Sequence, residues 1–136
     1  MNPQDALRQY ATAAVEGRVE SATPHGLVAM LMDGALEKIA IARVHMGNGQ
    51  IAEKGEHISW AITIIAGLRA SLDREQGGEI AANLDALYDY MERRLLEANL
   101  RNDATMLDEV SGLLRQIKFG WDAIPEELRR AGGPTP

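Results

Sequence analysis

Four long segments of this sequence carry apolar residues at alternating spacings of three and four, and this pattern constrains the fold more than any other feature. The spacing places the apolar residues of each segment on one face of an α-helix. The segments cover about residues 24–46, 50–75, 78–100 and 104–123, with short connections between them. This arrangement predicts an all-α fold, an antiparallel up-down-up-down four-helix bundle with a short N-terminal helical segment.

The stretch from Ser71 to Met91 is expected to join the second and third helices. Its Gly77-Gly78 pair supplies the backbone freedom that an abrupt helix end requires, so we expect the chain to reverse there as an αα-hairpin. An apolar stripe then restarts with the spacings of one helical face, through Ile80, Leu84, Leu87 and Met91.

The two ends of the chain differ from this central part. Residues 1–17 are expected to be an N-terminal capping segment with a weak helix over about residues 3–16, and Tyr10 is its only aromatic side chain. The bundle is expected to cover residues 18–124, with Thr23 capping its first helix and Pro24 at the first helical position. Residues 125–136, rich in glycine and proline, are expected to form a flexible C-terminal tail.

Composition excludes several classes of protein. The chain of 136 residues has a net charge of −6 and a pI of about 5.0, which argues against nucleic-acid binding. It has no cysteine, hence no disulfide framework, and no apolar run long enough to insert into a membrane. The first residues lack the pattern of a secretory signal, so the expected location is the cytoplasm (cytosol).

The residues offer little catalytic chemistry. The histidines are His25, His45 and His57. A di-iron bundle requires a glutamate three residues before a histidine, and none of these three histidines has one. Phosphate-binding loops, dinucleotide fingerprints and nucleophile elbows are also missing from the sequence. We therefore expect neither an enzyme nor a metal or other cofactor, and structural or solvated roles for the three histidines.

Apolar residues exceed what one stripe per helix requires. Wide apolar core faces would account for part of the excess, and a groove for a partner helix would account for the rest. The sequence leaves both interpretations open. The residues outside or at the edges of the stripes are Leu27, Leu31, Trp60, Ile64, Tyr88, Tyr90, Leu96, Met106 and Leu113.

Several blocks of residues together resemble a known family. The opening Ser-Ala-Thr-Pro of residues 21–24, the Gly-Gly-Glu-Ile of residues 77–80 and the Leu-Tyr-Asp-Tyr-Met of residues 87–91 occur in the order found in FliS flagellar secretion chaperones. The resemblance covers about residues 10–121. Two departures are a methionine at Met32, where the family commonly has an aromatic residue, and Ala22-Thr23, where it commonly has Ala-Ser.

The resemblance implies a cytoplasmic chaperone that binds the C-terminal region of flagellin, prevents premature polymerisation and aids delivery to the flagellar type III export gate. Tyr10 is then expected to gate or contact the client. Asp89 and Arg94 are expected to hold polar groups of the client. The expected lining of the flagellin-binding groove is Leu27, Leu31, Ile64, Leu68, Tyr88, Met91 and Leu95.

The rival interpretation is a helical adaptor or a homodimerising bundle without a role in secretion. Such a protein would bury the same excess apolar faces against a second copy of itself or another partner. Self-association therefore remains an alternative use of these faces.

Overall fold

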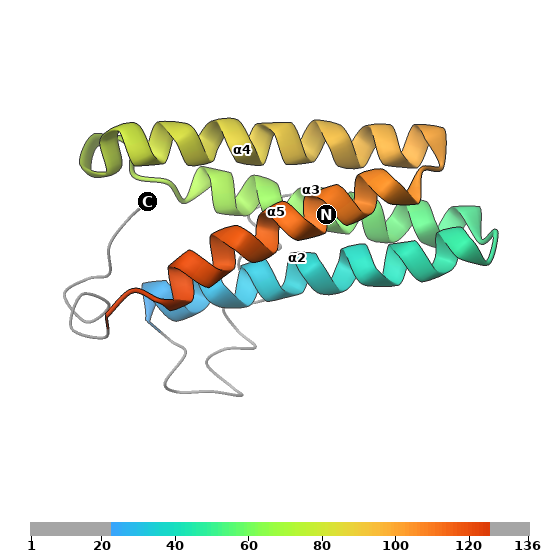
Figure 1. Ribbon diagram of the computed structural model, residues 1–136, viewed down its shortest axis with the longest axis horizontal. Helices are drawn as coiled ribbons and strands as arrows, with labels where there is room; N and C mark the ends of the chain where they lie inside the picture. Colours follow the sequence, from blue (N-terminus) through green and yellow to red (C-terminus); the bar gives the residue numbers. More distant parts are fainter. Residues whose placement is uncertain (1–22, 126–136) are drawn as a thin grey trace.

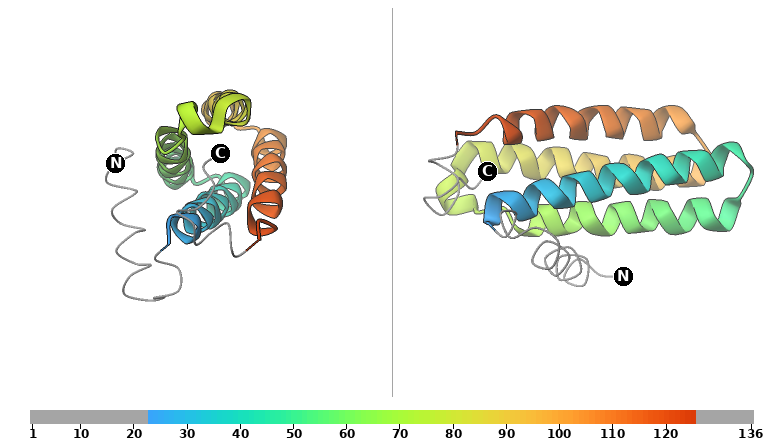
Figure 2. Two further views of the ribbon diagram at one scale, coloured as in Figure 1. Left: turned by 90° about the vertical axis from the view of Figure 1, so that its left-hand side faces the viewer. Right: turned by 90° about the horizontal axis from the view of Figure 1, so that it is seen from below.

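The computed structural model describes residues 23–125, which form four antiparallel helices (Figure 1). They are α2 (Pro24–Gly47), α3 (Ile51–Ala70), α4 (Arg74–Arg101) and α5 (Ala104–Asp122), and no strand occurs among the described residues. Seen from the end, the helices surround one axis, and α5 closes the bundle by packing against both α4 and α2 (Figure 2). The predicted all-α four-helix bundle is confirmed.

Side-chain caps fix where three of the helices begin. Thr23 Oγ1 accepts a hydrogen bond from the Gly26 amide at 3.0 Å, as its position before Pro24 predicts. Asp73 caps α4 by accepting from two backbone amides, both at 3.1 Å. Asp103 caps α5 through the Thr105 amide at 2.8 Å. These caps satisfy amide groups that the first turn of a helix leaves without intrahelical partners.

The predicted reversal at Gly77-Gly78 is wrong. Helix α3 ends at Ala70, and the chain turns at residues 71–73, because the Asp73 cap starts α4 before the glycines are reached. Gly78 instead produces a kink inside α4, with φ 52° and ψ −126°. A side chain at such a backbone conformation is strained, which explains the use of glycine there.

The four apolar stripes meet in one core. On α4 the predicted stripe is partly wrong, since Ile80 is 66% exposed and Leu87 is 37% exposed. The buried face includes Ala81 and Tyr88 instead. These two residues are seven apart, two helical turns on one face, and the buried positions after Tyr88 follow at spacings of three and four. The buried residues of α4 are Ala81, Tyr88, Met91, Leu95 and Ala98.

His25 and Trp121 connect the start of α2 to the end of α5 by a ring stack and two hydrogen bonds. The His25 and Trp121 rings stack with their centroids 4.6 Å apart. His25 Nε2–H donates to the Trp121 carbonyl at 2.7 Å, and Trp121 Nε1–H donates to the His25 carbonyl at 2.9 Å. His25 is therefore a structural residue, as the sequence predicts.

Three sequence expectations lie outside the described residues: the helix over residues 3–16, the position of Tyr10 and the tail after residue 125. Between residues 23 and 125, no helix combines the length and apolar content required to cross a membrane.

Candidate protein-binding surface

Most of the side chains expected to line a groove are core residues. They lie between the helices with at most 2% of their surface exposed. The broad apolar faces of this bundle absorb them, which favours the core interpretation of the excess apolar residues. A client meeting the closed bundle would not touch them. The buried members of the expected groove are Leu31, Ile64, Leu68, Tyr88, Met91 and Leu95.

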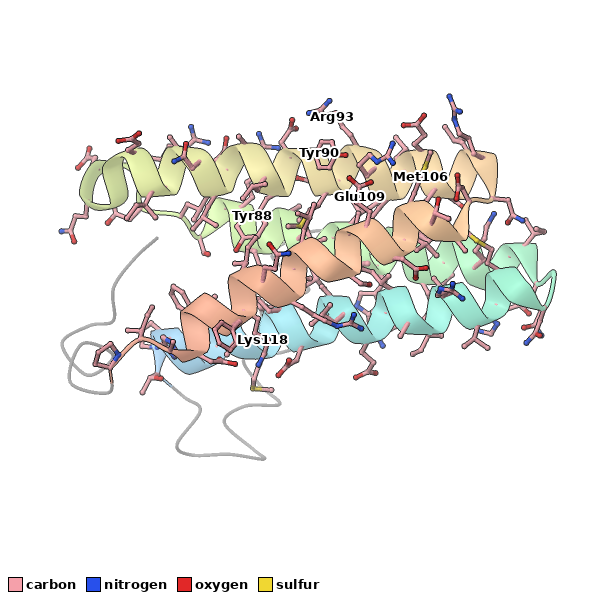
Figure 3. The ribbon with its side chains drawn as sticks, in the orientation of Figure 1. Tyr88, Tyr90, Arg93, Met106, Glu109 and Lys118 are labelled. Atoms are coloured by element: carbon pink, nitrogen blue, oxygen red, sulfur yellow. The ribbon has the colours of Figure 1, made fainter. Side chains whose placement is uncertain are left out.

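Tyr88 illustrates the difference between the expected groove and the observed core. Its side chain is 1% exposed, and burial raises the pKa of its phenol to about 12. Figure 3 shows Tyr88 and Tyr90 on the same helix, α4. Tyr90 is only partly buried and donates its hydroxyl to Glu109 of α5 at 2.5 Å. Of these two tyrosines, only Tyr90 is near the surface.

The expected polar contacts of the client are already engaged within the bundle. Asp89 accepts from Arg69 of α3 at 3.2 Å and from Arg93 of its own helix at 3.1 Å. Arg94 reaches Glu109 of α5 at 2.8 Å. The hydrogen bond from Tyr90 and the pairing with Arg94 lower the pKa of Glu109. Asp89 and Arg94 therefore help to hold neighbouring helices together. Leu27 is half-buried on α2.

The described surface has a pocket on one face of α3. Its volume is about 320 Å³, and the described residues that line it are Glu56, Ser59, Trp60 and Thr63. These positions share a face because they are separated by three, four and seven residues. The side of the pocket thus combines an indole ring with hydroxyl and carboxylate groups.

Trp60 makes this pocket chemically distinctive. Its Nε1 is buried and has no hydrogen-bond acceptor among the described residues. Lys38 of α2 places its Nζ 3.7 Å from the centroid of the indole ring, a cation–π contact. The Trp60 pocket, defined by the four lining residues above, therefore offers a partner segment an indole ring beside hydroxyl and carboxylate groups.

The sequence indicated Trp60 only weakly. Its position outside the main stripe of its helix marks it as surplus, but the same criterion also selected Ile64, which is fully buried. Spacing alone does not distinguish them. The distinction depends on which neighbouring helix covers each face, and that is a tertiary property.

Other apolar side chains are exposed singly or in pairs along the bundle. Ile80 and Leu87 are seven residues apart on α4, two helical turns on the same face. Within residues 23–125, no group of three or more histidine, aspartate or glutamate side chains is arranged to hold a metal ion. The exposed large apolar residues are Val44, Ile51, Ile80, Leu87, Leu96, Leu100 and Phe119.

Comparison with known proteins assigns the family. Residues 6–128 match the family described as Flagellar protein FliS. This chain belongs to the FliS family. The resemblance based on the blocks between residues 10 and 121 is therefore confirmed, and it extends beyond them at both ends.

The FliS relatives align over nearly their whole length. The chain is 52% identical over 124 residues to the flagellar secretion chaperone FliSB of Pseudomonas aeruginosa, covering 91% of this chain and 98% of that protein. It is 51% identical over 125 residues to the flagellar secretion chaperone FliS of Salmonella typhimurium, covering 91% and 93%. For the protein of the same name in Bacillus subtilis the identity is 36% over 129 residues, covering 94% and 96%.

Proposed function

We propose that this chain is a cytosolic export chaperone that binds the C-terminal segment of flagellin, prevents its premature polymerisation and aids its delivery to the flagellar type III secretion apparatus. The observation that carries the proposal is the alignment, over 91% of this chain, with relatives named flagellar secretion chaperones. The function is that of a chaperone and not of an enzyme.

The physical basis of the proposed activity is burial of an amphipathic client segment. A segment that polymerises through an apolar face is removed from that equilibrium when the chaperone covers the face. Burial contributes roughly 25 cal/mol per Å² of apolar surface before ordering costs are subtracted. Ordering a disordered client costs several kcal/mol, about 2–5, which keeps the complex releasable.

The Trp60 pocket is the part of the described surface that we assign to the client. It combines an aromatic ring with polar side chains, which suits an amphipathic segment. The indole ring of the pocket would contact an apolar side chain of that segment. Delivery then requires a competing partner, which we propose to be the export gate.

Titration calorimetry with the flagellin C-terminal peptide and with full-length flagellin tests the function. We expect one client per chaperone. The absence of binding with both ligands would refute the proposal. A stable dimer that refuses flagellin would instead support the helical adaptor or homodimer.

A substitution tests the pocket separately from the function. Trp60→Phe replaces the indole by a smaller ring, and we expect client affinity to fall about fivefold, the equivalent of about 1 kcal/mol of buried aromatic surface. Gln116→Ala, at an exposed polar position on α5, is the control and should leave affinity unchanged. If Trp60→Phe binds flagellin as tightly as the wild type, the client contacts another surface while the function stands.

A client could also bind by inserting between the helices and contacting the six buried members of the expected groove. These residues would become accessible only if neighbouring helices separated. Hydrogen exchange with bound flagellin distinguishes the two routes. Surface docking leaves the core amides of α4 protected, whereas insertion of the client raises their exchange.

The N-terminal segment is a separate part of the proposal. We propose that residues 1–16, which include Tyr10, cover part of the client surface when no client is bound. Deleting these residues should leave the bundle folded and change flagellin affinity. If the deletion unfolds the protein, the segment belongs to the core.

A further inference from the structure

Two histidines from different helices lie side by side near the connection between α2 and α3. His45 is in the last turn of α2, and His57 is in the second turn of α3. Their ring centroids are 5.2 Å apart, and the ring planes are inclined by 34°. Both side chains are partly exposed, so an ion from solvent can reach them. The chaperone role proposed above uses neither residue.

Hydrogen bonds select the same tautomer in both rings. His57 Nδ1–H donates to the backbone carbonyl of Glu53 at 2.9 Å, and a carbonyl can only accept. His45 Nδ1–H donates to Gln50 Oε1 at 2.7 Å. In each neutral ring the lone pair is therefore on Nε2, which has no hydrogen-bond partner among residues 23–125. Metal-binding histidines in proteins are oriented in this way, with the other ring nitrogen donating to a carbonyl or carboxylate.

The separation of the rings fits a shared metal ion. Imidazole nitrogen binds Zn²⁺ at about 2.0–2.1 Å, which places the ion about 3.1 Å from the ring centroid. Two rings around one ion then have centroids about 5 Å apart at the tetrahedral angle of Zn²⁺ and about 4.4 Å apart at the right angle that Cu²⁺ prefers. The observed 5.2 Å is the tetrahedral value, and a side-chain adjustment of less than about 1 Å reaches the other.

We propose that Nε2 of His45 and Nε2 of His57 bind one divalent transition-metal ion between α2 and α3. No third protein ligand is in place in the described part of the chain, so water completes the coordination. Among divalent ions, a site of imidazole and water binds Cu²⁺ most tightly, ahead of Ni²⁺ and Zn²⁺. The ion links two helices across the turn at residues 48–50 and stabilises the native state, because the unfolded chain does not hold the two rings together.

Trp60 reports occupancy of this site. Its ring centroid is 6.3 Å from that of His57, and bound Cu²⁺ quenches the fluorescence of a nearby indole. We expect titration of the full chain with Cu²⁺ to give saturable quenching with one ion per chain. Zn²⁺ and Ni²⁺ should raise the thermal unfolding midpoint less than Cu²⁺ does.

Substitutions identify the ligands. His45→Asn and His57→Asn should each weaken Cu²⁺ binding by at least about tenfold. Trp60→Phe should remove most of the quenching and keep the Cu²⁺-dependent rise of the unfolding midpoint. Glu56→Gln is the matched control on the same helix and should bind Cu²⁺ like the wild type.

Three outcomes would overturn the site. They are quenching that does not saturate, wild-type affinity in both histidine variants, and an unfolding midpoint that Cu²⁺ does not raise. Each histidine variant is compared with the wild type by its unfolding midpoint without metal, so that misfolding is detected separately. None of these outcomes depends on flagellin binding.

Discussion

Lys54 is a lysine buried in the interior, and its partners among residues 23–125 are two amide oxygens and no carboxylate. It is 3% exposed, and its Nζ donates to the Asn99 carbonyl and to Asn102 Oδ1, both at 3.0 Å. These acceptors are at the C-terminal end of α4, where the helix leaves carbonyl groups without intrahelical partners and where a positive charge is favourable. A lysine of α3 thus helps to terminate α4, while its aliphatic stem packs against the core.

The first prediction concerns this lysine. Lys54→Met keeps the stem but removes both hydrogen bonds to the end of α4, and we expect the free energy of unfolding to fall by about 2 kcal/mol. Urea unfolding followed by circular dichroism measures the loss. Arg93→Met is the control, because its side chain is 69% exposed and its ion pair with Asp89 should contribute no more than about 0.5 kcal/mol. Equal losses in the two variants would contradict the role assigned to Lys54.

At the scale of the element, α4 has a kink at Gly78, in the second turn of the helix. Gly78 departs from helical geometry, but the residues after it form a regular helix up to Arg101. A Cβ at Gly78 would meet no atom within 4 Å, so the requirement for glycine arises from backbone conformation and not from crowding.

The second prediction uses two glycines in equally open surroundings. Gly78→Ala should destabilise the protein by about 1–3 kcal/mol, because alanine must adopt a strained backbone conformation. Gly112→Ala, in α5 and also without atoms within 4 Å of the new Cβ, should stabilise it by about 0.5–1 kcal/mol. Thermal unfolding of both variants gives the comparison, and a stabilised Gly78→Ala would show that the kink is not required.

The third prediction concerns the contact between the ends of α2 and α5. Trp121→Phe keeps a ring to stack on His25 but leaves the His25 carbonyl without its indole donor, so we expect a loss of about 1–3 kcal/mol. Phe119→Leu on the same helix, at a position 79% exposed, should change stability by less than about 0.5 kcal/mol. Chemical unfolding distinguishes them, and two equally stable variants would exclude an energetic role for this contact.

At the scale of the whole molecule, ion pairs join three pairs of neighbouring helices. Arg69 of α3 contacts Asp85 of α4 at 2.6 Å, and Arg43 of α2 contacts Asp108 of α5 at 2.6 Å. The hydrogen bond from the arginine is the main cause that lowers the pKa of each aspartate. The pKa of Glu109, between α4 and α5, is lowered as well.

The fourth prediction follows from these pKa shifts. A carboxyl group whose pKa is lower in the folded state contributes stability above its unfolded pKa of about 4, and this stability is lost as the pH falls through the lowered value. We therefore expect urea unfolding midpoints that are constant down to about pH 5 and fall below pH 4. Burial raises the pKa of Glu92, which has the opposite sign and offsets part of the loss.

Asp85→Asn tests the origin of the acid transition. The variant loses the charged partner of Arg69, so it should be less stable than the wild type at neutral pH. Because the amide does not titrate, the variant should also lose less stability on acidification. An acid transition equally steep in both proteins would show that Asp85 does not contribute to it.

The sequence by itself determined the helices, their order and the family. The spacing of apolar residues, the cap at Thr23 and the short connections are local properties, and they were sufficient to predict an antiparallel bundle. The competition between the glycine pair and the Asp73 cap was harder to judge from the sequence. The glycine pair suggested a reversal, but Asp73 starts the helix earlier because it satisfies two amides that would otherwise lack partners.

Only the tertiary structure decided which apolar side chains face the core. Leu87 and Tyr88 are adjacent in sequence, and both fit a helical stripe, but the packing of α4 against its neighbours buries Tyr88 and leaves Leu87 partly exposed. The cation–π contact of Lys38 with Trp60 and the pairing of His45 with His57 likewise depend on contacts between α2 and α3. Spacing gives the face on which a residue lies, whereas the neighbouring helices determine whether that face is covered.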